Sequence, residues 1–299
     1  MDINLIGVPI KYGCDKDGVQ YGPDKLRELG IVNLIKNNDN NVYDMGNIYV
    51  PAILDECKFD WHETMKYFDP IVDVNVNLAH SVYSSLKSEA FPFVIGGDHS
   101  LGMGSIAGAS KYFENIAVIW VDAHGDINDT ETSPSGNIHG MPLAASMNVG
   151  HPKLTNLYFK GSKVKPENVY IIGARDLDPG EVDLAERLKL NLYTMDMIND
   201  IGLKEVLEDT IDKIKSSKVD GVHLSFDIDV LDNAISPGTG TPVKDGLNVV
   251  ESKLILDKIL DANFVTSMDF VEFNPLLDIE NKTEDICLEL LNLIFNKLN

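Results

Sequence analysis

Acidic residues and histidines follow three apolar segments of this chain, in a pattern that could bind metal ions. The run FPFVIGG is followed by Asp98-His99-Ser100, IAVIWV by Asp122-Ala123-His124-Gly125-Asp126, and GVHLSF by Asp227-Ile228-Asp229. Successive side chains of an extended segment point to opposite sides, so Asp122, His124 and Asp126 should share one side, as should Asp227 and Asp229. Together with His99, these residues give six candidate metal ligands.

Four carboxylates in one dry crevice would repel one another and lose hydration, so the cluster requires cations. Two divalent ions would supply the matching positive charge. Oxygen-rich ligands with some imidazole and no thiolate favour Mn²⁺, with Zn²⁺, Co²⁺ and Fe²⁺ as alternatives. We therefore predict two Mn²⁺ ions per chain. Two ions that share a water molecule lower its pKa toward neutrality, which predicts a hydrolase.

Each segment alone has a simpler interpretation. Asp98 could cap a helix that begins near Ser100, His99 could be a buried core or turn histidine, and an Asp-x-Asp after a strand is usually a turn or a cap. The occurrence of such residues after three strands favours a shared site, because the carboxyl ends of parallel strands meet at one edge of a sheet.

The surrounding sequence predicts the sheet that brings these ends together. Apolar runs with the length of buried strands lie at Ile3–Val8, Phe91–Ile95, Ile116–Val121, Val169–Ile172, Val222–Phe226 and Phe264–Phe270. Helical patterns lie between them, and a closing helix is predicted at Thr283–Leu298 with Thr283 as its N-cap. This alternation predicts one α/β domain over residues 1–299, with a parallel sheet covered by helices on both faces. A closed eight-stranded barrel is the competing architecture, which the irregular strand spacing does not favour.

The composition restricts the partners and the compartment. The chain has 25 lysines and arginines against 47 aspartates and glutamates, a formal net charge of −22, whereas nucleic-acid binding normally needs a basic face. No run reaches the roughly 18 apolar residues of a membrane span. The three cysteines have no paired spacing, which fits a reducing compartment. We expect a cytoplasmic protein without nucleic-acid or membrane partners.

Beyond these patterns, the chain resembles the ureohydrolases and, within them, the arginases. The resemblance lies in six ordered motifs: GGDHS (96–100), DAHGD (122–126), SGNIHG (135–140), RDLDPGE (175–181), SFDIDVLD (225–232) followed by GTP (240–242), and EFNP (272–275). It implies a three-layer α/β/α fold with a mostly parallel eight-stranded sheet and a binuclear manganese centre. It also implies a homo-oligomer, trimeric or hexameric, that hydrolyses L-arginine to L-ornithine and urea with a metal-bridging hydroxide.

The resemblance also implies a role for each motif residue. One ion would be bound by His99, Asp122, Asp126 and Asp229, and the other by Asp122, His124, Asp227 and Asp229, so that Asp122 and Asp229 bridge. Asp126 would accept and pass on a proton, His139 would shuttle protons, and Glu272 would orient the guanidinium. The α-carboxylate and α-amino group would be held by Asn128, Ser135, Asn137 and Asp178, and Thr241 would lie near the guanidinium or the hydroxide.

Other activities stay open at this point. Agmatinase, guanidinobutyrase and formimidoglutamase are the nearest alternatives, and SGNIHG favours arginine over agmatine because a site built for a carboxylate would leave donors unmet by agmatine. A mononuclear amidase of the deacetylase kind shares the expected architecture and an Asp-x-His pair. The number of metal ions per chain would distinguish it.

Overall fold

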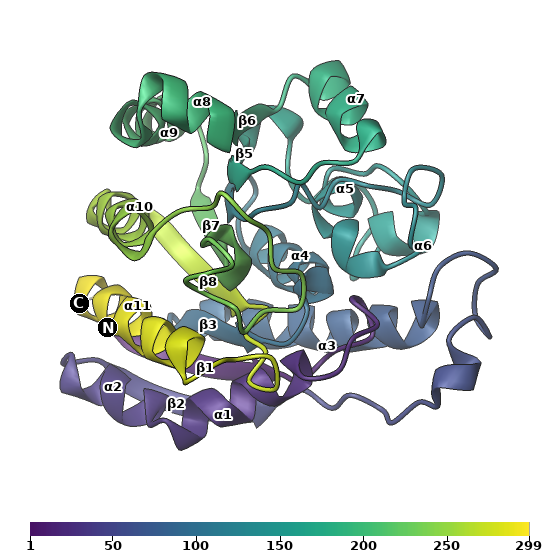
Figure 1. Cartoon of the computed structure of the whole chain (residues 1–299), viewed down its shortest axis with the longest axis horizontal. Coiled ribbons are helices and arrows are strands. Elements are labelled where there is room, and N and C mark those ends of the chain that lie inside the picture. Colours follow the sequence, from purple (N-terminus) through teal and green to yellow (C-terminus); the bar gives the residue numbers. More distant parts are fainter. Residues whose placement is uncertain (299) are drawn as a thin grey trace.

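An eight-stranded sheet runs through the computed structural model, which describes residues 1–298. Its strands are β1 (Asp2–Val8), β2 (Asn41–Asn47), β3 (Phe91–Gly96), β4 (Ile116–Val121), β5 (Val169–Ala174), β6 (Asn191–Thr194), β7 (Gly221–Asp227) and β8 (Val265–Val271). They lie in the order β2-β1-β3-β8-β7-β4-β5-β6, and each of these neighbouring pairs is parallel. The sheet is open, with β2 and β6 at its edges, so the predicted α/β fold is confirmed and the barrel is not formed (Figure 1).

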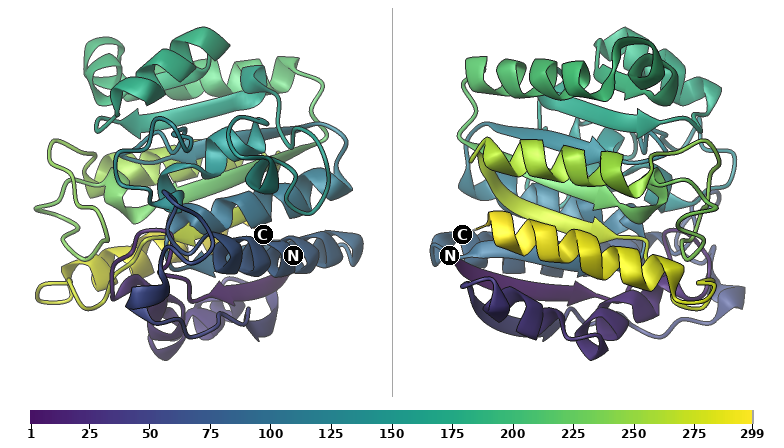
Figure 2. Two further views of the ribbon diagram at one scale, coloured as in Figure 1. Left: turned by 90° about the vertical axis from the view of Figure 1, so that its right-hand side faces the viewer. Right: turned by 60° about the vertical axis from the view of Figure 1, so that its left-hand side comes forward.

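Helices cover both faces of the sheet and complete three layers (Figures 1 and 2). One layer contains α1 (Gly22–Glu28), α2 (Ile31–Asn37), α8 (Met195–Ile201), α9 (Leu203–Ser216), α10 (Val249–Asp261) and α11 (Lys282–Lys297). The other contains α3 (Phe68–Lys87), α4 (Gly102–Tyr112), α5 (Pro142–Ser146), α6 (Pro152–Thr155) and α7 (Pro179–Leu188). Within residues 1–298, no helix combines the length and the apolarity that crossing a membrane requires.

The central strands are apolar throughout because both of their faces are buried. On β4, Trp120 packs with the layer of α4, α5 and α7, whereas Ile119 and Val121 pack with the layer of α9 to α11. All six residues of β4 are buried. This double burial is the reason that the strand can be recognised as a continuous apolar run.

Neither edge strand was predicted from the sequence. The β2 sequence NVYDMGN is mostly exposed, and β6 has four residues, of which one is buried. An edge strand is only partly covered, so its sequence has little of the apolar signal that marks a central strand.

The predicted N-cap of the last helix was wrong. Helix α11 begins at Lys282, and Thr283 lies inside its first turn, where its hydroxyl accepts a 2.7 Å hydrogen bond from the N–H of Gly238. The side chain of Asp278 accepts instead from the N–H groups of Thr283 and Glu284, each at 2.9 Å. The capping acid therefore comes from the preceding loop and does not flank the helix directly.

Candidate active site

Four adjacent strands at the centre of the sheet deliver the candidate residues to one edge. His99 follows β3 in a short 3₁₀ turn, η3 (His99–Leu101), and Asp122 directly follows β4. Asp227 is the last residue of β7, and Glu272 directly follows β8. These strands are neighbours in the order β3-β8-β7-β4, so segments far apart in sequence meet in one crevice.

One group of candidate ligands surrounds His99. Its Nδ1 lies 2.9 Å from Asp122 Oδ2, 3.1 Å from Asp227 Oδ2 and 3.4 Å from Asp126 Oδ2. Its other ring nitrogen, Nε2, lies 2.8 Å from the hydroxyl of Ser225. When Nε2 carries the proton and donates to Ser225, the lone pair of Nδ1 faces three carboxylates, an arrangement that suits a cation placed between them.

A second group surrounds His124. Its Nδ1 lies 3.2 Å from Asp229 Oδ2 and 3.3 Å from Asp122 Oδ1, and Thr241 donates its hydroxyl hydrogen to Asp229 Oδ2 at 3.0 Å. The ligand atoms of His99, Asp122 and Asp227 lie within 4.8 Å of one another, and so do those of Asp122, His124 and Asp229. Asp122 belongs to both groups, with Oδ2 toward His99 and Oδ1 toward His124, so the two groups share its carboxylate.

The grouping of the side chains differs from the ligand sets that the resemblance implies. Asp227, rather than Asp229, lies beside His99, while Asp229 lies beside His124. The expectation that residues 227 and 229 share a side assumed a continuing strand, but β7 ends at Asp227 and the turn η6 (Ile228–Val230) begins at the next residue. The backbone N–H of Asp229 there donates to Asp227 Oδ1 at 2.8 Å. The turn thus gives the two carboxylates different neighbours.

The buried charges shift the pKa values of these groups. Burial, and next the charge of Asp122, raises the pKa of Asp126 well above its ordinary value, and burial with the charges of Asp229 and Asp122 does the same for Asp227. Burial by itself would lower the pKa of His99, but its hydrogen bond with Asp122 and the charges of Asp122 and Asp126 raise it to about 9. These shifts all reflect an excess of negative charge in a dry crevice, and divalent cations would neutralise it.

A cavity of about 280 Å³ opens beside the two groups. It is lined by the predicted residues His124, Asp126, Asn128, Ser135, Asn137, His139, Asp178 and Thr241, and also by Ser133, Gly140, Asp176 and Glu181. The sequence reasoning gave no role to the last four. Three of these four lie inside the SGNIHG and RDLDPGE motifs, namely Gly140, Asp176 and Glu181, and Ser133 lies just before SGNIHG. Their position in or beside these motifs could have identified them as lining residues.

His139 and Glu272 meet at the wall of this crevice. Nδ1 of His139 lies 3.3 Å from Glu272 Oε1, which also accepts a 2.9 Å hydrogen bond from the N–H of His99. The other oxygen of Glu272, Oε2, is buried and has no hydrogen-bond partner among the described residues. Glu272 does not line the cavity itself, and the side chain of His139 is 16% exposed. One carboxylate oxygen is therefore buried with its hydrogen-bonding capacity unused.

Two of the predicted substrate residues, Asn128 and Asp178, are hydrogen-bonded to each other. Asn128 Nδ2 donates to Asp178 Oδ2 at 2.9 Å, and Asn128 Oδ1 is buried without a partner in the described chain. Asp178 is also the N-cap of α7, where it forms a capping box with Glu181. Glu181 accepts from the N–H of Ile127 at 3.1 Å, and burial raises its pKa to about 7.

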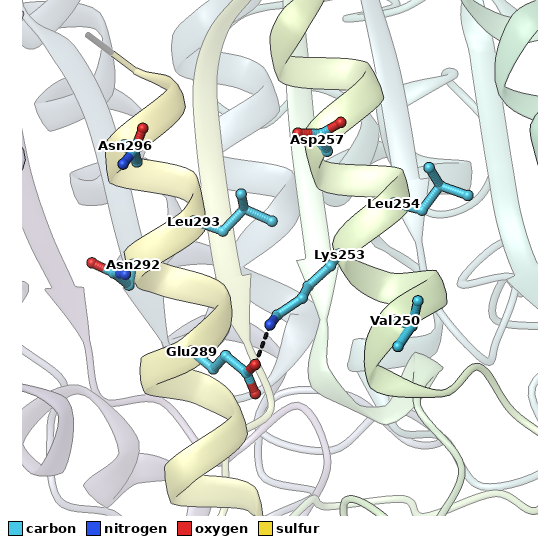
Figure 3. A pocket seen from close by; sticks show the side chains of 8 residues that line it. All are labelled: Val250, Lys253, Leu254, Asp257, Glu289, Asn292, Leu293 and Asn296. Atoms are coloured by element: carbon cyan, nitrogen blue, oxygen red, sulfur yellow. Dashed lines mark hydrogen bonds and ion pairs between the residues drawn. The ribbon is translucent and has the colours of Figure 1, made fainter.

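A larger cavity lies elsewhere and carries different chemistry. It has a volume of about 690 Å³ and follows the outer surface between α10 and α11, where Lys253 and Glu289 form an ion pair (Figure 3). Val250, Leu254 and Leu293 supply its apolar part. It contains no histidine and none of the residues at the carboxyl edge of the sheet, so the candidate metal ligands lie beside the smaller cavity and not beside this one.

Comparison with known proteins gives matches over almost the whole chain. Residues 1–295 match the model of the Arginase family. An arginase of Brevibacillus brevis is 44% identical over 294 residues, which cover 98% of this chain and 97% of that protein. The structure of the arginase of Bacillus caldovelox superposes with a TM-score of 0.93 at 41% identity, covering 98% of each chain. That of the Entamoeba histolytica arginase in complex with L-ornithine superposes with a TM-score of 0.89 at 32% identity, again covering 98% of each chain.

Proposed function

The chain belongs to the arginase family, and from this premise we propose that it hydrolyses L-arginine to L-ornithine and urea at a centre of two Mn²⁺ ions. The observation that carries the proposal is the pair of ligand groups that share Asp122 beside the cavity. Two groups favour two ions over the single ion of a deacetylase-like amidase. Bound divalent ions would lower the pKa of water and supply hydroxide at neutral pH.

The charges of the cavity favour a cationic substrate. Four of its lining residues are carboxylic acids, Asp126, Asp176, Asp178 and Glu181, and in the described chain none of its lining residues is a lysine or an arginine. The guanidinium group of arginine is planar and cationic and donates paired hydrogen bonds to carboxylates. Glu272 is suited to orient it, because Oε2 is buried without a partner while Oε1 is held by the N–H of His99.

Asp126 and His139 are suited to transfer the protons. Asp126 lines the cavity, and its Oδ2 lies 3.4 Å from His99 Nδ1, so its carboxylate is placed to accept a proton beside the candidate metal ligands. His139 lines the cavity, is partly exposed and lies 3.3 Å from Glu272, so it can exchange protons between the site and bulk water. Asn128, Ser135, Asn137 and Asp178 form the wall that would bind the α-carboxylate and the α-amino group. Thr241 would hold Asp229 in place.

The proposal is tested by metal analysis together with a substrate panel. The protein is stripped with a chelator, reloaded with Mn²⁺, Zn²⁺, Co²⁺ or Fe²⁺, and assayed with L-arginine, agmatine, 4-guanidinobutyrate and N-formimino-L-glutamate. We expect two Mn²⁺ per chain and the highest kcat/KM for urea release from L-arginine. One bound Zn²⁺ per chain, or no urea from L-arginine with two Mn²⁺ bound, would refute it.

Variants of the two ligand groups test the shared centre. Asp227→Asn should weaken the ion beside His99, and Asp229→Asn should weaken the ion beside His124, so each variant should lose part of the bound metal and most of the activity. His80 is exposed and lies outside both groups, so His80→Gln is the matched control and should keep both ions. If His80→Gln lost metal while Asp227→Asn and Asp229→Asn kept both ions, this assignment would be excluded.

The assembly and the compartment are also part of the proposal. We expect a homo-oligomer, trimeric or hexameric, which light scattering at several protein concentrations would test. We expect it in the cytoplasm, since Cys14, Cys57 and Cys287 are all free thiols, as in a reducing compartment.

A further inference from the structure

The cavity has a polar wall but no strong cation of its own. The lining includes four carboxylic acids and neither lysine nor arginine within the described chain. Asp126 is a candidate metal ligand and burial raises the pKa of Glu181 to about 7, so Asp176 and Asp178 are the carboxylates that a substrate carboxylate would meet when it enters the cavity. A nearby positive charge would offset that repulsion.

Lys66 provides such a charge directly behind the wall. Its ammonium group donates to Asn137 Oδ1 at 2.8 Å, and Asn137 lines the cavity. The same ammonium lies 2.9 Å from the carboxylate of Asp15, which Lys58 also contacts at 3.0 Å. Two ammonium groups and one carboxylate leave one positive charge in this cluster.

The contact with Lys66 also fixes the orientation of the Asn137 amide. Asn137 Nδ2 donates to the carbonyl oxygen of Cys14 at 3.1 Å. Turned over by half a rotation, the amide would place its NH₂ group against the Lys66 ammonium and its oxygen against the carbonyl of Cys14, and both contacts are repulsive. The amide has two N–H groups and Cys14 uses one, so the second is available to a carboxylate.

The backbone holds Lys66 in this position. Its N–H donates to the carbonyl oxygen of Gly136 at 3.0 Å, which fastens the segment before α3 to the loop that carries Ser135 and Asn137. The side chain of Lys66 is 18% exposed, compared with 33% for Lys58. Lys66 is therefore held in place behind the cavity wall and is not a freely moving surface lysine.

We propose that Lys66 determines specificity, favouring substrates that carry an α-carboxylate over guanidino compounds that lack one. It acts through the orientation of Asn137 and through its charge. This inference rests on the proposed function, because it concerns the binding of L-arginine at the same site.

The test compares Lys66→Met with Lys58→Met in the manganese-loaded protein. Both lysines contact Asp15, but only Lys66 contacts Asn137, so Lys58→Met controls for the loss of one positive charge from the cluster. Lys66→Met should raise KM for L-arginine about tenfold, equivalent to ~1.4 kcal/mol, with a much smaller effect on kcat. Lys66→Arg should restore most of the loss. The affinity for L-ornithine, measured by calorimetry, should fall by a similar factor, whereas that for 1,4-diaminobutane, which lacks the carboxylate, should not.

The outcomes separate the inference from the proposed function. If the manganese-loaded wild-type protein makes no urea from L-arginine, the proposed function fails. If the wild type is active, two results would overturn the inference alone. One is that Lys66→Met binds L-ornithine as tightly as the wild type does, and the other is that its affinities for L-ornithine and 1,4-diaminobutane fall equally. Circular dichroism verifies that each variant is folded, and Lys66→Gln replaces Lys66→Met if that variant does not fold.

Discussion

Replacement of Arg175 by methionine should destabilise the protein and loosen the candidate metal centre at the same time. The five N–H groups of the Arg175 guanidinium donate to six backbone carbonyl oxygens at 2.8–3.3 Å, one N–H being shared between two of them; these are the oxygens of Gly173, Asp229, Val230, Leu231, Val243 and Lys244. One of these belongs to Asp229, whose carboxylate lies beside His124. The guanidinium thus joins the turn that carries a candidate ligand to the loop at residues 243–244.

The size of the effect follows from these contacts. Methionine fills a similar length without a donor, so the hydrogen bonds of all five N–H groups are lost. At the lower end of the usual net contribution, ~0.5 kcal/mol for each bond, the free energy of unfolding should fall by about 3 kcal/mol. A chain of this length has an unfolding entropy of about 0.6 kcal/mol per kelvin, so Tm should fall by about 5 °C.

Arg27 offers a matched control. It donates to the side chains of Asp24, Asp44 and Asn47 and to the carbonyl oxygen of Gly46, near the outer edge of the sheet and far from the candidate ligands in the strand order. Its ion pairs are with carboxylates that are 29% and 64% exposed, and such pairs contribute at most ~1 kcal/mol. Arg27→Met should therefore lower Tm by less than about 2 °C.

Thermal unfolding and Mn²⁺ titration of both variants provide the assay. Arg175→Met should bind Mn²⁺ about tenfold more weakly, because the backbone at Asp229 loses its anchor, while Arg27→Met should bind it as the wild type does. Equal Tm losses in the two variants, or unchanged Mn²⁺ affinity in Arg175→Met, would show that Arg175 does not anchor the turn at Asp229.

Three further predictions concern metal, pH and backbone conformation. Mn²⁺ at about 100 times its Kd should raise the free energy of unfolding by ~2.7 kcal/mol per site, which corresponds to about 4 °C in Tm. A chelator should reverse this shift, and a Tm in scanning calorimetry that does not respond to metal would contradict the prediction. Burial, and next the charges of His62 and Lys153, lowers the pKa of His151, whose Nδ1 accepts from the N–H of Lys153 at 3.1 Å. The stabilisation by neutral His151 is thus present at neutral pH and is lost as the pH falls through the lowered pKa. The variant His151→Asn keeps the N-cap acceptor but does not titrate, so the difference in unfolding free energy between pH 7 and pH 5 should become smaller by ~1 kcal/mol. An unchanged difference would count against the capping role. Alanine at Gly136, where φ is 70°, would bring its Cβ to 2.0 Å from the carbonyl oxygen of Thr64, so Gly136→Ala should lower the free energy of unfolding in denaturant by more than ~2 kcal/mol. Gly161→Ala, at φ 97° with open space around it, should lower it by only ~1 kcal/mol. Similar losses in the two variants would exclude the clash.

The sequence predicted the parts of the fold that are buried on both sides. The central strands, such as β4, are continuous apolar runs, and their order along the chain already required a parallel sheet with helical connections. The edge strands β2 and β6 and the cap of α11 were not predictable in the same way, because exposed positions carry weak signals and the capping Asp278 lies several residues before the helix.

The candidate site was predictable as a set of residues but not as a geometry. The six candidate ligands come together at one edge of the sheet, as the three strand-end motifs indicated. Their pairing was not predictable, because it depends on the turn η6, which separates Asp227 from Asp229. Lys66 carried no motif, and its link to Asn137 arises only when the segment before α3 folds back on the loop at residues 135–137.

Backbone conformation explains why two of the carboxylates proposed to act in the reaction are held firmly. Asp126 has φ 52° and Glu272 has φ 65°, values that are unfavourable for residues other than glycine. Each is fixed by neighbouring backbone, since Asp126 O accepts from the N–H of Leu143 at 3.1 Å and the N–H of Glu272 donates to Gly97 O at 2.9 Å. The strained conformations let each chain segment turn sharply at the end of its strand and aim its carboxylate into the crevice. The surrounding hydrogen bonds therefore set the positions of these carboxylates before a metal ion or a substrate binds, which reduces the rearrangement that binding would require.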